Sequence, residues 1–267
     1  MDETTFGELL RTWRDRRRLT QEDLSHVSGV STRHLSFLET GRSNPSREMV
    51  LELAEHLEIP LRERNQLLTA AGFAPVYSRT PLEAPEMEVV RSAIGQVLAG
   101  HEPYPAVAVD RYWNIVDMNR AAAVFAADVD PELMGPPPNV YRISLHPDGL
   151  APRVVNFPEL AHHLLHRLRH DVEVSADPDL AELLAEIESY PTVRELPRRP
   201  PVEQHAIVVP VRLRTPRGEL SMFSTISTFG TPVDVTVAEL ALETFFPADA
   251  ETAAKLSAMS EADSSAA

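Results

Sequence analysis

The sequence of 267 residues predicts an α+β protein in which an all-α domain precedes an antiparallel sheet domain wrapped by helices. Apolar residues recur at helical spacing between positions 6 and 71, and two strong strand patterns occupy 205–214 and 218–229. Between them, three prolines interrupt residues 75–85, as in a linker. We therefore predict a helical domain at 1–76, a linker and amphipathic helix at 77–99, a sheet domain at 100–250 and a flexible tail at 251–267.

Five short helices are expected in the first domain. Phe6, Leu10 and Trp13 share one face of the first helix, and Thr20 begins the second as an N-cap, with Asp23 three residues later. Gly29 allows a tight turn before the third helix, and two more helices begin at Pro45-Ser46 and at Pro60. Two short helices joined by a glycine-containing turn, the second with a polar outer face, form a helix-turn-helix.

The segment LTQEDLSHVSGVSTRHLSFLETGRSNPS carries Thr20-Gln21, Gly29, Leu38-Glu39 and Gly41-Arg42 in one pattern. It resembles the helix-turn-helix of the xenobiotic-response-element family, which includes the lambda and 434 repressors, over about 65 residues. The resemblance implies sequence-specific binding to double-stranded DNA. The positions that it assigns to DNA are Gln21, Ser31, Thr32, Arg33, Ser36, Phe37, Arg42 and Asn44.

Within this set, Gln21 is expected at a backbone phosphate, and Arg42 and Asn44 beyond the third helix. Arg33 is the strongest candidate for base recognition, because a guanidinium can pair with both acceptors of a guanine edge. Phe37 either touches a thymine methyl group or belongs partly to the core. Arg14 matches a family position that pairs with Glu39, which implies a structural ion pair and no DNA contact.

The net charge of -15 appears unsuited to DNA, but it is unevenly distributed. Residues 1–78 hold 10 basic and 12 acidic side chains, whereas the remainder holds 15 and 28. The first domain also gathers basic residues in RTWRDRRR, residues 11–18. A local basic patch guides a protein onto DNA, and acidity elsewhere weakens non-specific binding.

The second domain is expected to begin with the amphipathic helix at 86–99, which either pairs with its copy in a dimer or packs on its own domain. A strand, a turn, a strand and an Asn119-led helix follow within 104–125, then helices at 157–170 and 179–189. The two strong strands at 205–229 form a hairpin through TPRG, and VTVAELALETFF at 235–246 is expected to be a helix.

This order of elements resembles the ligand-binding domain of the methylenomycin-activator-like (MmyB-like) regulators. The likeness lies in Trp113-Asn114-Ile115-Val116, Asn139, Leu168-Arg169 and the closing FGTPVDVTVAELALETFFPAD. It implies a PAS-like domain that takes a small apolar ligand such as a fatty acid, with no other cofactor. The candidate ligand residues are Val107, Val109, Trp113, Arg142, His205, Ile207, Val209 and Met222, and either Arg142 or His205 would meet an acyl carboxylate.

The same apolar residues would equally fill a solid core, so a protein-interaction domain without a ligand is the alternative. A third possibility is a metal, because His162, His166 and His170 lie on one helical stripe, although no carboxylate completes the spacing. The sequence contains no HExxH, no GxSxG and no phosphate-binding glycine loop, so we expect no enzyme.

The composition is compatible with a cytoplasmic regulator. Cysteine is absent, which excludes disulfides and thiolate metal sites, and neither a signal peptide nor an apolar run long enough for a membrane span is present. Because one recognition helix reads few base pairs, we expect a homodimer on two half-sites.

Overall fold

The computed structural model describes residues 4–175, 177–198 and 208–264, without the side chains of 262–264. The chain divides into two compact units, and each is treated separately below. The first comprises residues 1–84 together with 230–238, and the second comprises 85–229 together with 239–267. Within the described ranges, no helix is long and apolar enough to cross a membrane.

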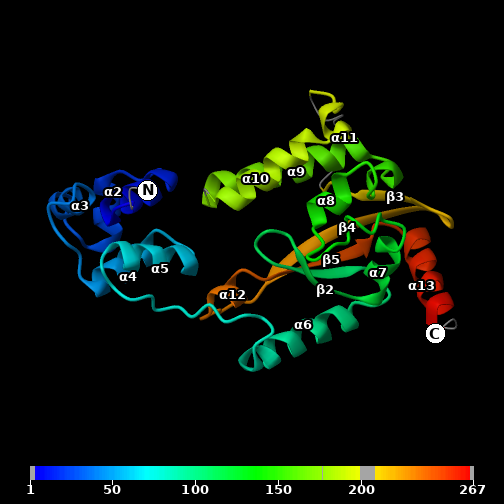
Figure 1. Ribbon diagram of the computed structural model, residues 1–267, viewed down its shortest axis with the longest axis horizontal. Coiled ribbons are helices and arrows are strands. Elements are labelled where there is room, and N and C mark those ends of the chain that lie inside the picture. Colours follow the sequence, from blue (N-terminus) through cyan, green and yellow to red (C-terminus); the bar gives the residue numbers. More distant parts are fainter. Residues whose placement is uncertain (1–3, 176, 199–207, 265–267) are drawn as a thin grey trace. The chain divides into compact units, whose positions relative to one another are not determined.

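Five helices build the first unit: α1 (Phe6–Arg16), α2 (Gln21–Ser28), α3 (Thr32–Glu39), α4 (Arg47–His56) and α5 (Leu61–Ala70) (Figure 1). Capping boxes at Thr5–Glu8 and Thr20–Asp23 begin α1 and α2, and Ser31 caps α3. Each cap satisfies backbone N–H groups that the helix leaves unpaired. Gly29, with φ of 68°, ends α2 in the left-handed region, as the turn requires.

The core of this unit excludes water from the inner faces of all five helices. Its largest members, nearly all fully buried, are Leu10, Trp13, Leu24, Leu35, Leu38, Leu53, Leu57 and Leu68. The predicted five-helix domain is confirmed, and its third helix is held by both α1 and α2.

A close approach at Gly7 sets the position of α3. A Cβ atom on Gly7 would lie 2.6 Å from the backbone oxygens of Leu38 and Glu39, at the C-terminal end of α3. Those atoms belong to backbone and cannot rotate away, so only glycine lets α1 approach α3 this closely.

The segment 230–238 is an unexpected part of the first unit, because the sequence predicts it within the sheet domain. It contains the short helix α12 (Val235–Ala238), which packs on α5. The Asp234 carboxylate accepts hydrogen bonds from the backbone N (3.1 Å) and Oγ1 (2.8 Å) of Thr80, and the Val235 N–H donates to Ser78 (2.8 Å). The predicted linker is therefore paired with a segment about 150 residues later.

The second unit is built on one antiparallel sheet of five strands in the order β2-β1-β5-β4-β3. The strands are β1 (Ala106–Val109), β2 (Ile115–Met118), β3 (Val211–Thr215), β4 (Gly218–Thr228) and β5 (Ala241–Pro247). β5 is central: Val107 pairs with Glu243, and Ser224 pairs with Phe245. Helices surround the sheet, so the fold is the predicted PAS-like α+β arrangement.

Two groups of helices cover the sheet (Figure 1). In the view of Figure 1, the paired helices α9 (Phe157–Ser175) and α10 (Pro178–Ser189) lie above the sheet, and α6 (Glu88–Gly100) lies below it. The remaining elements of the unit are α7 (Arg120–Ala126), α8 (Val140–Leu145), α11 (Pro191–Arg194) and α13 (Ala250–Ser264), with 3-10 turns at Pro85–Met87 and Ala151–Arg153.

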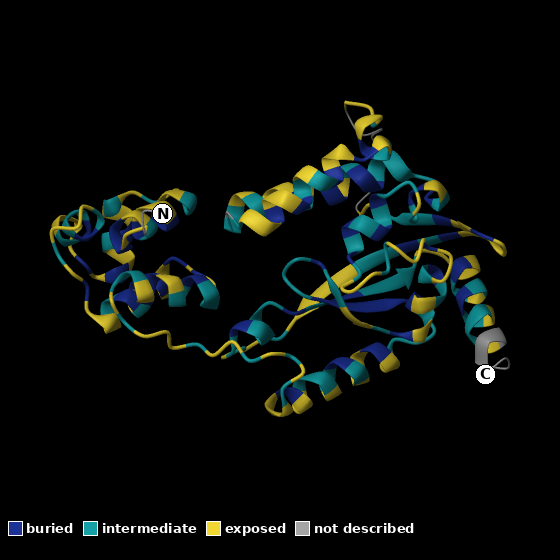
Figure 2. Cartoon of the chain, viewed as in Figure 1, coloured by how far each residue is buried: buried dark blue, intermediate teal, exposed yellow. Residues whose placement is uncertain are grey.

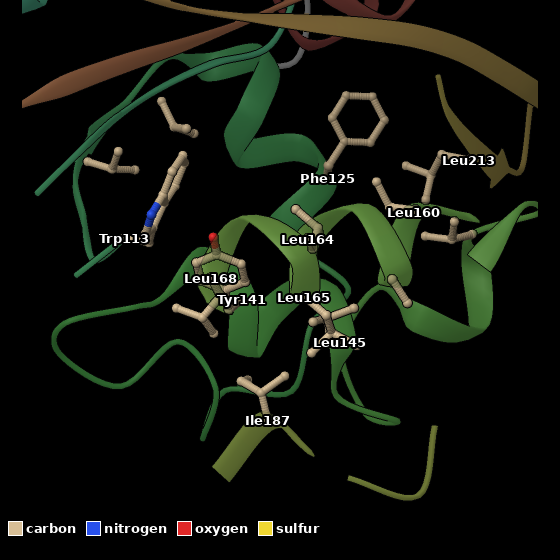
Figure 3. Close-up of a cluster of buried hydrophobic side chains, with 14 of the residues drawn as sticks. Trp113, Phe125, Tyr141, Leu145, Leu160, Leu164, Leu165, Leu168, Ile187 and Leu213 are labelled. Atoms are coloured by element: carbon tan, nitrogen blue, oxygen red, sulfur yellow. The ribbon is translucent and has the colours of Figure 1, made fainter. Parts of the chain in front are cut away.

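Burial follows the amphipathic patterns of these helices (Figure 2). The apolar side of α9 packs with Trp113, Phe125 and Tyr141 in one cluster, which Figure 3 shows in close-up. Ile94 and Leu98 of α6 are buried, and α6 contacts β1 and β2. The helix expected at 86–99 therefore packs on its own domain, which is one of the two arrangements that the sequence allows.

Three predicted elements were wrong in part. The expected helix at 235–246 is a helix only at α12 and becomes strand β5, because β1 and β4 offer hydrogen bonds on both sides of it. As far as Ser264, the expected flexible tail is a helix, α13 (Ala250–Ser264), which packs on β4 and β5 and buries Leu256. The strand expected at 205–214 begins only at Val211, and residues 205–207 lie outside the described part.

Replacing Gly7 by alanine should destabilise the first unit by about 1–3 kcal/mol, because the new methyl group forces α1 away from α3. Urea unfolding of the full chain, followed by far-ultraviolet circular dichroism, measures this. Gly95→Ala in α6 is the matched control, since a Cβ there meets nothing within 4 Å and alanine favours a helix by up to about 1 kcal/mol. Equal stability of Gly7→Ala and the native chain would contradict the close-approach argument.

Candidate DNA interface and ligand pocket

The third helix of the first unit, α3, is held by a buried ion pair. Arg14 on α1 donates to Glu39 at the end of α3 through Nε (2.6 Å) and Nη2 (3.1 Å), and its Nη1 donates to the Leu19 carbonyl (2.7 Å). The Arg14 side chain is 10% exposed and the Glu39 side chain 4%. Pairing with Glu39 raises the pKa of Arg14. The predicted structural ion pair is confirmed, and it orients α3.

The outer side of α3 presents polar and basic groups to solvent. Thr32 and Arg33 are exposed, and Ser36 and Phe37 are half-buried. The Ser31 hydroxyl oxygen caps the helix by accepting a hydrogen bond from the backbone N–H of His34. The Arg33 guanidinium lies 5.4 Å from the Phe37 ring centroid, a cation–π contact. Phe37 thus supports Arg33 on the surface and is not a core residue.

Other predicted DNA residues lie around this helix. Arg42 and Asn44 are exposed in the loop that follows α3. Gln21 donates its side-chain amide to Glu39 (2.9 Å), which joins the start of α2 to the Arg14–Glu39 pair. In the basic segment 11–18, Arg17 donates to the carbonyls of Leu57 (2.7 Å) and Glu58 (2.8 Å), so part of that segment has a structural use.

The second unit contains a cavity of about 160 Å³ between the sheet and its helices. Most of its wall is apolar and comes from every layer of the unit: Val107, Phe125, Ile143, Leu160, Leu164, Val211, Leu213, Met222 and Phe245. The polar residues on the wall are Ser144, His163, Arg167, Ser224 and Glu243. Mostly apolar cavities with a few polar groups are typical of small-ligand sites.

Arg167, on the inner side of α9, is the main polar feature of this wall. Its guanidinium carbon lies 3.8 Å from the centroid of the Trp113 ring, and its Nε donates to the Tyr141 hydroxyl (3.2 Å). Its Nη2 is buried and has no hydrogen-bond partner among the described residues. Burial raises the pKa of Tyr141 to about 12, so the hydroxyl stays protonated at neutral pH.

Glu243, at the centre of β5, provides the opposite charge. The residue is 5% exposed, and its Oε1 accepts a hydrogen bond from Ser224 Oγ (2.8 Å). The same oxygen lies 4.0 Å from Arg167 Nη1, too far for a hydrogen bond. The guanidinium and the carboxylate therefore face each other at the cavity with donors and lone pairs that remain available.

Trp113 adopts an uncommon backbone conformation that places its ring beneath Arg167. Its φ of 63° lies in the left-handed region, which is unusual for a bulky residue. The Asp110 side chain stabilises the turn by accepting hydrogen bonds from the backbone N–H groups of Tyr112 (2.8 Å) and Asn114 (2.9 Å). The Trp113 Nε1 is 3.4 Å from Asp171, whose pKa burial raises.

The predicted ligand residues fall into four groups. Val107, Val209 and Met222 line the cavity, whereas Val109 and Trp113 belong to the surrounding core. Arg142 is not on the cavity wall: it makes a bidentate ion pair with Glu186 (2.7 and 2.9 Å), which lowers the pKa of Glu186. His205 and Ile207 lie outside the described residues.

The sequence reasoning missed Arg167, Ser224 and Glu243. A signal for Arg167 existed, since it lies seven residues after Leu160 and three after Leu164, on the apolar side of the helix. Glu243 carried no such signal, because its segment was expected to be a helix.

The histidine stripe of α9 shows no metal-site geometry. His162 bonds to the Pro197 carbonyl (2.8 Å), and His166 and His170 are exposed. Across the described ranges, no group of three or more histidine and acidic side chains is arranged to hold a metal.

Comparison with known proteins gives two regions of likeness. Residues 5–67 match a helix-turn-helix domain family. The repressor RghR of Bacillus subtilis (strain 168), an HTH-type transcriptional repressor, is 44% identical over 70 residues, which are 26% of this chain and 50% of that protein. The chain therefore matches only half the length of this curated relative. An RNA-binding Light-Oxygen-Voltage receptor of known structure aligns with 97% of this chain and 63% of its own, at 12% identity and a TM-score of 0.25.

The larger match covers the unit that contains the cavity. Residues 90–259, more than half of the chain, match the ligand-binding domain of MmyB-like transcription regulators. The chain belongs to this family of transcription regulators, with an N-terminal helix-turn-helix domain and an MmyB-like ligand-binding domain.

Proposed function

We propose that the chain is a cytoplasmic, homodimeric regulator that binds operator DNA through α3 and senses a small, fatty-acid-like apolar ligand in its second unit. The observation that carries the proposal is the cavity of about 160 Å³, apolar over most of its wall, in a chain whose recognition helix is exposed. A solid core would leave no such space, since interiors are otherwise packed to high density.

For DNA recognition, Arg33 is assigned to the base edges and Arg42 to the phosphate backbone. Arg33 lies in the first turn of α3, the part of a recognition helix that enters the major groove in repressors of this type. Phe37 beneath it restricts the guanidinium and keeps its donors directed outward. Two copies on half-sites about 34 Å apart would supply the affinity that one short helix lacks.

The route from ligand to DNA runs along β4 and β5. Both strands contribute to the cavity wall, through Met222 and Ser224 on β4 and Glu243 and Phe245 on β5. The segment that connects these two strands, 230–238, packs within the first unit through Asp234 and Val235. A ligand that favours one arrangement of the strands would thereby favour one placement of the connected segment, in proportion to its differential affinity.

Native mass spectrometry of the purified chain, followed by denaturation and extraction, tests the sensor proposal. We expect a dimer with a bound apolar molecule, or a dimer that takes one up from a panel of short and medium acyl compounds. A stable complex with another protein and no small-molecule binding would instead favour the protein-interaction alternative.

Arg33→Ala should abolish the preference for an operator selected from a random library while weak, salt-sensitive binding persists. Loss of a bidentate guanine contact costs about 1–3 kcal/mol of discrimination. Competition gel shifts with operator and scrambled DNA measure it. Arg42→Ala is the contrasting variant: it should weaken both DNAs alike and reduce the salt slope by about one. Unchanged preference in Arg33→Ala would exclude Arg33 from base reading.

Asp234→Ala should abolish the effect of ligand binding on operator affinity, because it removes both hydrogen bonds to Thr80. We expect operator affinity without ligand to stay within about threefold of native, and the change caused by the extracted ligand to shrink toward none. Fluorescence anisotropy with labelled operator measures both. Asp128→Ala, an exposed carboxylate paired with Arg153 in the second unit, is the control. A full ligand response in Asp234→Ala would disprove this route.

A further inference from the structure

The polar end of the cavity has a composition that restricts the ligand's head group. Arg167 presents a buried Nη2 without a partner, and its Nη1 is 4.0 Å from Glu243. One carboxylate oxygen of Glu243, Oε1, accepts a hydrogen bond from Ser224, and among the described side chains none donates a hydrogen bond to the other oxygen. A donor group and an acceptor group therefore lie next to each other on one wall.

The charges of this pair sum to zero. A ligand carboxylate that approached Arg167 would also approach the buried Glu243 carboxylate, and like charges in a poorly solvated site repel strongly. A ligand ammonium would meet the Arg167 guanidinium in the same way. Asp171, which lies beside the Trp113 ring and close to Arg167, adds a second acidic group on this side.

A neutral head group that both accepts and donates hydrogen bonds avoids repulsion by Glu243 as well as repulsion by Arg167. Its oxygen can accept from the Arg167 guanidinium, and its N–H or O–H can donate to Glu243, so each buried polar group gains a partner. A primary amide provides both functions on adjacent atoms, and a hydroxyl provides them on one atom.

The volume of the cavity restricts the ligand body as well. At about 160 Å³ it is close to the engineered cavity of 150 Å³ that binds benzene. A molecule of ring size or a chain of about six carbons matches this space.

We infer that the cavity selects a compact apolar molecule with a neutral donor-and-acceptor head group, of the amide or alcohol class, held between Arg167 and Glu243. This inference rests on the proposed ligand-sensing function. It keeps the apolar body of a fatty-acid-like ligand and replaces the carboxylate head group by a neutral amide or alcohol. It also differs from the sequence expectation that Arg142 or His205 meets a free carboxylate.

The test compares hexanamide, hexan-1-ol and hexanoate on the full-length chain at pH 7.5, with dissociation constants from ligand-observed NMR titration. These molecules share a six-carbon body, and only hexanoate is charged at that pH. We expect hexanamide to bind at least tenfold more tightly than hexanoate, with hexan-1-ol between them.

Glu243→Gln is the informative variant, because it keeps the shape and an acceptor for Ser224 but removes the negative charge. It should strengthen hexanoate binding at least tenfold and reverse the preference. The double variant Arg167→Met with Glu243→Gln leaves no buried charge at either position and should bind all three with little discrimination. Arg169→Met, an exposed neighbour on α9 paired with Glu188, should keep the native order.

Two results would overturn the inference in distinguishable ways. Tighter binding of hexanoate than of hexanamide by the native chain would disprove the neutral head group and leave the sensor proposal intact. Binding of none of the three molecules by the native chain or by any folded variant, as judged by circular dichroism, would remove the small-ligand function together with the inference.

Discussion

The position of one charged side chain, Arg167, constrains the whole ligand-binding unit. A guanidinium on the inner side of α9 would be costly in an apolar core without compensation. The Trp113 ring, the Tyr141 hydroxyl and the Glu243 carboxylate each supply part of that compensation. They come from the β1–β2 turn, from α8 and from β5, so this charge joins three elements that are distant in sequence. Trp113 reaches its place only through a left-handed backbone, a conformation that costs about 1–3 kcal/mol in a non-glycine residue.

The two units differ in their charged side chains: arginines are prominent in the first unit, and acidic residues are in excess in the rest of the chain. In the first unit, Arg14 and Arg17 are used to hold helices together, whereas Arg33 and Arg42 are exposed. Most of the excess negative charge belongs to the residues after 78. Under the proposed function, that acidity would oppose non-specific attraction to a polyanion, so that affinity for DNA would depend on the few exposed arginines around α3. Selective recognition of DNA is in this way compatible with a negative net charge.

The helix-turn-helix was predictable because its signals are local. Thr20, Gly29 and Ser31 each determine the backbone within a few residues, and the structure uses all three as caps. The segment ALETFF was not predictable in this way, because its strand state depends on pairing with β4, more than ten residues away, and with β1, more than one hundred residues away. Arg142 was a reasonable candidate for a ligand until its bidentate partner Glu186, 44 residues later, was known. Non-local partners thus account for both the missed strand and the misassigned cation.

The β4–β5 connection places Glu243 only a few residues from the segment 230–238, which packs within the first unit. β5 begins at Ala241, three residues after α12 ends at Ala238, and Glu243 is only two residues further along. The backbone therefore runs from the cavity wall to a helix that packs on α5 within a very short distance along the chain. Glu243 lies on a strand that is paired on both edges, with β1 and with β4. Under the proposed function, a ligand held at Glu243 would act on this strand, and the short connection would carry the effect to Asp234 and Val235, to which Thr80 and Ser78 of the proline-containing linker are hydrogen-bonded.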